Sequence, residues 1–221
     1  MTPDERIDEL EAVLARFLKP IRGVPFPVVI KALADVSVLP IDHESVSDRA
    51  LIDKIASAAK AVGSAVRANP IRRNRPNEVG NDIEPFVIDA LLTCDLRAER
   101  PRSAKGRGQQ VGYPDILLYD REDRPTYLEC KIFGEGTAMT TMRSFYLSPS
   151  ANPQVCLHAR HMLLAFGVDR EPISDSRDSL YRPSSFKLID LHNLKCDVKY
   201  EFNADNARLY SPDLLLAEGR V

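Results

Sequence analysis

The spacing of the apolar residues changes once along the chain, near residue 112, and this change constrains the fold more than any other feature. Before it, apolar side chains recur every three or four residues, which is typical of helices that bury one face. After it, residues 113–119 and 126–133 read as two strands joined by a polar turn at 120–125. The sequence therefore predicts helices followed by a sheet.

The helices of the first part are delimited by capping residues and prolines. The first begins at a capping box in residues 2–5 and ends at Pro20. Others are predicted at residues 28–36, at 47–69 and along an apolar stripe from Val79 to Leu91. These helices are expected to build structure rather than to carry chemistry.

The last part of the chain is predicted to add one helix and two strands. The helix is expected over residues 152–166, where His158 and His161 would share a helical face. Strands are expected at residues 186–191 and 197–202.

Composition and charge narrow the class of protein. The 221 residues are 44% hydrophobic and 28% charged, which is ordinary for a globular protein and excludes wholesale disorder. The net charge is −2, so no global positive field marks a nucleic-acid binder. No run of about 18 apolar residues occurs, and the acidic start lacks the apolar stretch of a signal peptide. We therefore expect a cytoplasmic protein without membrane contact.

The strand predicted at 126–133 carries two charges inside an otherwise apolar segment. Side chains alternate along a strand, so Leu128 and Cys130 face one way and Glu129 and Lys131 face the other. Burying ionised groups costs several kcal/mol each unless they are paired or bind a metal. Asp115, at the start of the partner strand, brings a second carboxylate to the same end. Two converging carboxylates favour a hard cation such as magnesium, and a lysine beside them can hold or deprotonate a water.

These residues resemble the PD-(D/E)xK nuclease superfamily. Pro114-Asp115 matches the PD half of its motif, and residues Glu129-Cys130-Lys131 match the ExK half across a hairpin. The resemblance implies that Asp115 and Glu129 ligate Mg²⁺ together with the Cys130 carbonyl, while Lys131 orients and activates the attacking water. The implied reaction is metal-assisted hydrolysis of a phosphodiester.

A carboxylate on the preceding helix often completes the site in that superfamily. Glu84 is the best match for this role, and Glu78 is the alternative. Glu84 also stands before Pro85, so the residue could instead simply favour a helix start.

Two arginine-rich stretches flank the helix that carries Glu84, at residues 67–77 and 97–110, and both are predicted to be loops. Arginine bridges phosphates and reads guanine edges, and glutamine can read adenine. The residues expected to contact DNA are Arg72, Arg73, Arg75, Arg102, Lys105, Arg107 and Gln109.

Within the superfamily, a chain of this size most resembles a type II restriction endonuclease. That implies an α/β fold with a mixed central sheet flanked by helices and an N-terminal helical subregion. It also implies a homodimer that cuts both strands of double-stranded DNA, and a cognate DNA methyltransferase that protects the host. A single nuclease domain is expected over residues 1–221, with the helical subregion at 1–69 and the catalytic core at 78–202.

Three other functions stay open at this point. A nuclease of the same fold could cut branched or nicked DNA without regard to sequence. A non-catalytic DNA-binding module could have kept the fold, or the motif could be accidental in a protein that binds a small acidic ligand through its arginines. The four cysteines are far apart and lack a CxxC pair, so no zinc cluster is expected.

Overall fold

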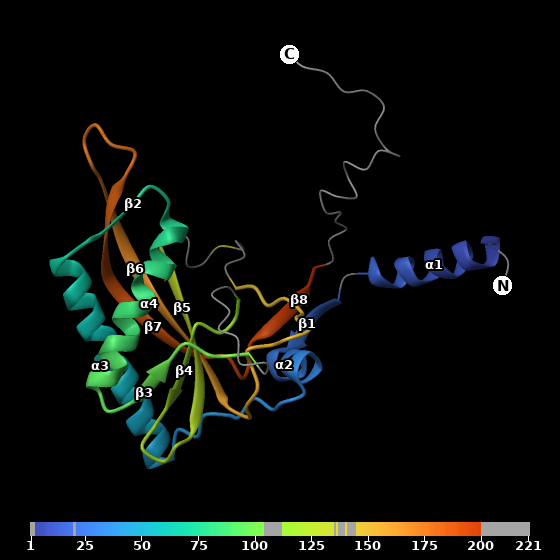
Figure 1. The fold of residues 1–221 in the computed structure, drawn as a ribbon, viewed down its shortest axis with the longest axis horizontal. Coiled ribbons are helices and arrows are strands. Elements are labelled where there is room, and N and C mark those ends of the chain that lie inside the picture. Colours follow the sequence, from blue (N-terminus) through green and yellow to red (C-terminus); the bar gives the residue numbers. More distant parts are fainter. Residues whose placement is uncertain are drawn as a thin grey trace. The chain divides into compact units, whose positions relative to one another are not determined.

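The computed structural model describes residues 3–19, 21–103, 112–134, 136, 140 and 145–199. The chain forms two compact units, one containing the two ends of the chain and the other spanning Pro25–Leu194. Figure 1 shows the elements of both units along the chain. None of the helices in the described ranges is long and apolar enough to cross a membrane.

The smaller unit contains the first helix and a two-stranded sheet. Helix α1 (Pro3–Phe17) confirms the predicted opening helix, while its apolar stripe from Ile7 to Phe17 stays exposed. Strand β1 (Ile21–Pro25) was not predicted; it pairs with β8 (Lys195–Val198), which shares only residues 197 and 198 with the strand expected at 197–202. Gly23 adopts a positive φ of 66°, and its backbone N–H donates to the Asp197 carboxylate at 2.9 Å.

The larger unit is built on a six-stranded sheet in the order β2-β7-β6-β5-β4-β3. Its strands are β2 (Ile71–Arg73), β3 (Arg97–Glu99), β4 (Ile116–Tyr119), β5 (Pro125–Phe133), β6 (Arg160–Pro172) and β7 (Ser179–Asp190). Strands β5 and β6 are parallel, and every other neighbouring pair is antiparallel. The sheet is therefore mixed, as predicted.

Two long helices pack on one face of this sheet. Helices α3 (Val46–Ala68) and α4 (Pro76–Thr93) lie side by side against it, while the shorter α2 (Phe26–Ala34) lies elsewhere in the unit (Figure 1). Ser45 caps α3 by accepting the backbone N–H of Asp48. The predicted stripes are buried in the core; they are Leu51, Ile55, Ala59, Val62 and Val66 on α3, and Val79, Ile83, Val87 and Leu91 on α4.

The prediction of a helix over residues 152–166 is wrong, because the residues from Arg160 onward form the strand β6, which is parallel to β5. Residues 161–168 are almost continuously buried, since both faces of this strand are covered. An unbroken apolar run fits a doubly buried strand as well as a helix, so periodicity does not distinguish them. His158 and His161 therefore do not share a helical face.

The two basic stretches predicted as loops contain short strands. Residues 71–73 form β2 and residues 97–99 form β3, at opposite edges of the sheet. Charged residues on edge strands oppose pairing with another sheet, so arginine has a structural use at both positions.

A buried ion cluster connects the sheet to α3. Asp48 is 1% exposed, and its Oδ1 accepts hydrogen bonds from Arg124 and from Arg160, each at 2.7 Å. Burial alone would raise the pKa of Asp48, but bonds from the Asp42 amide and both arginines outweigh it and lower the pKa. The cluster thus links the first turn of α3, the β4–β5 turn and the start of β6.

Replacing Asp48 with Ala is expected to lower the free energy of unfolding by about 3 kcal/mol, because the buried guanidinium of Arg160 loses its carboxylate partner and Arg124 keeps only Asp120 and Glu122. Urea unfolding followed by circular dichroism measures this. Asp53→Ala, at an exposed position of the same helix, is the control and should change the value by less than about 0.5 kcal/mol. Equal losses in the two variants would contradict the structural role given to Asp48.

Candidate active site

The carboxylates of Asp115 and Glu129 meet where β4 and β5 separate. Asp115 immediately precedes β4, and the register places Ile116 opposite Leu128. Since β4 begins only after Asp115, the backbone N–H of Cys130 donates to Asp115 Oδ2 at 2.7 Å. The Asp115 carboxyl also interacts with that of Glu129. The predicted convergence of the two acids is present.

Glu129 and Lys131 lie side by side on one face of β5. Lys131 Nζ donates to Glu129 Oε1 at 2.6 Å, and Leu128 and Cys130 belong to the core on the other face. The predicted alternation along this strand is confirmed. The Cys130 thiol is buried in that core, so only its backbone carbonyl remains for the predicted contact with a metal.

Burial controls the ionisation of this group. Glu129 is 4% exposed, and this desolvation, together with the charge of Asp115, raises its pKa to about 7. Desolvation also raises the pKa of Asp115, although the Cys130 N–H and Lys131 oppose the shift. For Lys131, burial would lower the pKa, but the neighbouring acids outweigh it and raise the pKa. Lys131 is therefore a cation at neutral pH.

Glu84 joins the same group from α4. Desolvation raises its pKa to about 7, the charge of Asp115 adds to this, and Lys131 and Arg100 oppose it. Glu84 lies well inside α4 rather than at its start, although Pro85 follows it. Glu78 lies exposed in the first turn of that helix, where its charge acts on Arg73.

Arg100 is a member of this group that the sequence interpretation did not single out. Its Nη2 lies 3.4 Å from Glu84 Oε2, and its charge also acts on Asp115. The residue directly follows β3, which pairs with β4 and so brings it beside the start of that strand. Predicting the strand at 97–99 would have revealed this neighbour.

The group of acids around Asp115 and Glu129 fits a divalent cation that takes some of its oxygen ligands from water or phosphate. Three carboxyl groups face two cationic side chains, and desolvation together with the charge of Asp115 raises the pKa of Glu84 and of Glu129 to about 7. Glu129 Oε2 is buried and accepts no hydrogen bond from the residues that the structure describes. In the described ranges, no three His, Cys, Asp or Glu side chains converge closely enough to hold a metal by themselves. Mg²⁺ commonly binds through one or two carboxylates and completes its shell with water or phosphate oxygens.

The arginines expected at DNA differ in their surroundings. Arg72 pairs with Asp178 at 2.8 Å, and Arg73 forms a two-pronged pair with Asp82 at 2.6 and 2.7 Å. Arg75 and Arg102 are exposed. The remaining expected contacts, Lys105, Arg107 and Gln109, lie outside the described residues.

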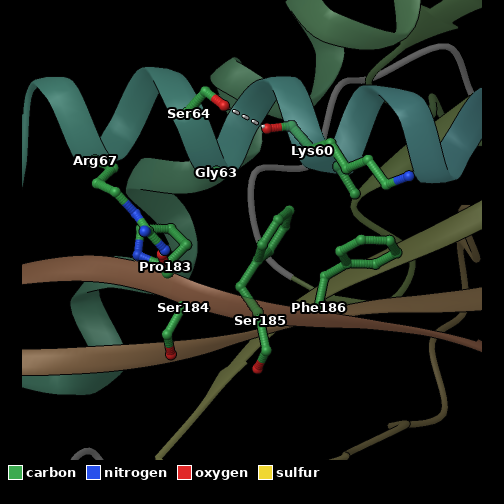
Figure 2. Close-up of a pocket in the computed structure, with 10 residues that line it drawn as sticks. Lys60, Gly63, Ser64, Arg67, Pro183, Ser184, Ser185 and Phe186 are labelled. Carbon is green, nitrogen blue, oxygen red and sulfur yellow. Dashed lines mark hydrogen bonds between the residues drawn. The ribbon is translucent and has the colours of Figure 1, made fainter.

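A separate pocket of about 570 Å³ lies between α3 and β7 (Figure 2). Its polar groups bond to backbone: Ser64 donates to the Lys60 carbonyl, and Arg67 donates to the Pro183 carbonyl at 2.8 Å. It contains none of the acids described above.

Replacing Glu129 with Gln is expected to stabilise the metal-free protein. Because the folded-state pKa is raised, stability falls as the pH rises from the ordinary glutamate pKa of 4.5 to about 7, and glutamine lacks this loss. The gain should be on the order of 1–3 kcal/mol at about pH 8 and vanish near pH 4. Urea unfolding in EDTA measures it, with exposed Glu44→Gln as the control. Equal stability of parent and Glu129→Gln at about pH 8 would contradict the raised pKa.

Comparison with known proteins identifies the family. The model of the type II restriction enzyme MjaV family matches residues 20–213. The type II restriction enzyme MjaV of Methanocaldococcus jannaschii is 34% identical over 226 residues, which cover 96% of this chain and 95% of that protein. No solved structure matches. The chain therefore belongs to the MjaV family of type II restriction enzymes, which are site-specific DNA endonucleases.

Proposed function

We propose that this restriction enzyme hydrolyses both strands of DNA in a Mg²⁺-dependent reaction at the Asp115–Glu129 pair. The observation that carries the proposal is the buried, undercompensated carboxyl of Glu129 beside Asp115, with Lys131 bonded to it on the same strand face. In a purely structural role, a buried carboxyl such as that of Glu129 would be destabilising without enough hydrogen-bond donors or cations around it.

The three acids and Lys131 each have a part in the proposed mechanism. Asp115 and Glu129 would hold the Mg²⁺, the Cys130 carbonyl would be a third oxygen ligand, and Glu84 would assist from α4. The bound cation supplies Lewis acidity and lowers the pKa of a water. Lys131, kept protonated by its acidic neighbours, donates hydrogen bonds that orient the attacking water and offset charge on the phosphate.

The enzyme is proposed to act as a homodimer. A symmetric dimer reads a palindrome because each subunit reads one half, and it brings one site to each DNA strand. The exposed face of α1 supports an association between copies, since Ile7, Leu10, Leu14 and Phe17 are each at least 40% exposed. A cognate DNA methyltransferase would protect the host DNA, and the enzyme would act in the cytoplasm, where that DNA lies.

Incubating the protein with plasmid DNA and Mg²⁺ tests the proposal. Discrete fragments, reproduced on a second plasmid with predictable lengths, are expected. Cleavage only of branched DNA would point to a structure-selective nuclease. A gel shift without cleavage would reduce the protein to a binding module, and either result would overturn the proposal.

Replacing Lys131 with Ala is expected to lower the single-turnover cleavage rate by a factor on the order of 10²–10⁴. DNA affinity measured in Ca²⁺ should stay near that of the parent, because the group acts on charge that develops only as the bond breaks. Lys131→Arg should not restore the rate, since guanidinium differs in shape from ammonium. Lys54→Ala, at a lysine that bonds the Asp95 carbonyl, is the control. Near-parent cleavage by Lys131→Ala would leave Lys131 with a structural role only.

Replacing Arg72 and Arg73 together with Ala is expected to reduce the salt dependence of DNA binding. Each phosphate contact adds about one unit to the log-log slope of affinity against salt, so a reduction of up to about two units is expected. Fluorescence anisotropy at several salt concentrations measures the slope. Arg121→Ala removes another exposed, paired arginine and serves as the control. If the slope stays unchanged, β2 lies away from the DNA.

A further inference from the structure

A buried histidine, His161, lies near the acid pair, on the neighbouring strand β6 and on the same face of the sheet as Glu129. His161 on β6 is opposite Tyr127 on β5, and Tyr127 precedes Glu129 by two residues on the strand. His161 is fully buried, and this desolvation lowers its pKa to about 3, so the ring is neutral at physiological pH. Neither the family motif nor the mechanism above uses this residue.

Aromatic rings enclose His161. The ring of Tyr113 lies beside it and nearly parallel to it, with 5.8 Å between the ring centroids and a 12° angle between the planes. Tyr127 lies at 5.0 Å, and Phe26 of α2 meets the imidazole edge-on at 5.4 Å. Phe145 in turn packs against both Tyr113 and Phe26. These rings hold the imidazole in one place and leave it little freedom to turn.

Tyr113 makes a short hydrogen bond to this fixed ring. Its hydroxyl lies 2.5 Å from His161 Nδ1. Tyr113 precedes Asp115 by two residues, and Asp115 is itself bonded to the Cys130 N–H at 2.7 Å. The segment 113–115 is therefore fixed at two points. The Tyr113 side chain is bonded to His161 of β6, and the Asp115 side chain is bonded to the backbone of β5.

We propose that Tyr113 and His161 are positioning residues that hold the Asp115 carboxylate in the orientation required for metal binding and cleavage. The proposal rests on the proposed role of Asp115. Partners behind a metal ligand fix its direction, and their loss commonly weakens metal affinity about 10- to 100-fold. The neutral imidazole suits this task, because it can form the bond to the Tyr113 hydroxyl without adding charge beside the acids.

The same cage supplies a matched control. The hydroxyl of Tyr127 is also bonded, but it accepts the backbone N–H groups of Cys156 and Leu157 at 2.9 and 3.2 Å. Tyr113→Phe and Tyr127→Phe thus remove the same atom from neighbouring rings. Only the first removes a bond that bears on Asp115.

The test measures Mn²⁺ binding to the full-length protein by calorimetry and single-turnover cleavage with saturating enzyme. Tyr113→Phe should weaken Mn²⁺ binding about tenfold and slow cleavage by a similar factor. Tyr127→Phe should change Mn²⁺ affinity less than about twofold. Equal Mn²⁺ affinity in the two variants overturns the proposal.

Substitutions of the histidine give an independent reading. His161→Leu should weaken Mn²⁺ binding as Tyr113→Phe does. His161→Asn should recover much of the affinity, because its amide can occupy the place of Nδ1 and bond the Tyr113 hydroxyl. A merely structural histidine would show no such recovery, and parallel losses in both variants would contradict the positioning role.

Asp115→Asn separates this inference from the proposed function. If Asp115→Asn binds Mn²⁺ like the parent, Asp115 is no ligand and the proposed site is wrong. If Asp115→Asn loses Mn²⁺ binding while Tyr113→Phe retains it, the site stands and the positioning role alone is refuted.

Discussion

The carboxyl group of Glu129 is almost fully buried on a central strand, and the arrangement of the site follows from the cost of placing it there. Desolvating a carboxylate costs several kcal/mol, which for Glu129 the ion pair with Lys131 offsets only in part. Burial, together with the charge of Asp115, raises the pKa of both Glu129 and Glu84 to about 7. A protein that keeps buried acids with so little compensating charge is less stable than it could be. The binding of a ligand at these acids would explain why they are kept.

The sheet brings these acids together by ending one strand early. Strand β4 begins only at Ile116, so the Cys130 N–H of the longer β5 is bonded by a carboxylate instead of a neighbouring strand. Strand β6 supports the other side of β5 in parallel, and its His161 fixes the segment that precedes Asp115. The two acids are thus held by ordinary backbone geometry and by an aromatic cage, and α4 adds Glu84 from the face of the sheet on which the long helices pack.

Local patterns predicted the parts of the site that depend on one element. Alternation along β5 predicted that Glu129 and Lys131 share one face of that strand. The apolar stripe of α4 predicted the helix that carries Glu84. The apolar run of β6 fits both a helix and a strand that is buried on both faces, and the prediction of a helix there is wrong. Arg100 and the Tyr113–His161 bond depend on strand pairing between distant segments, which no local spacing reveals.

A crystal structure of the protein soaked in Mn²⁺, with anomalous diffraction recorded to locate the ion, tests the central claim most directly. The account predicts an anomalous peak at about 2–2.6 Å from carboxylate oxygens of both Asp115 and Glu129, the range usual for oxygen ligands of divalent cations. It also predicts that Lys131 Nζ stays close to Glu129. A peak elsewhere in the molecule, or none at these carboxylates in well-ordered density, would contradict the account.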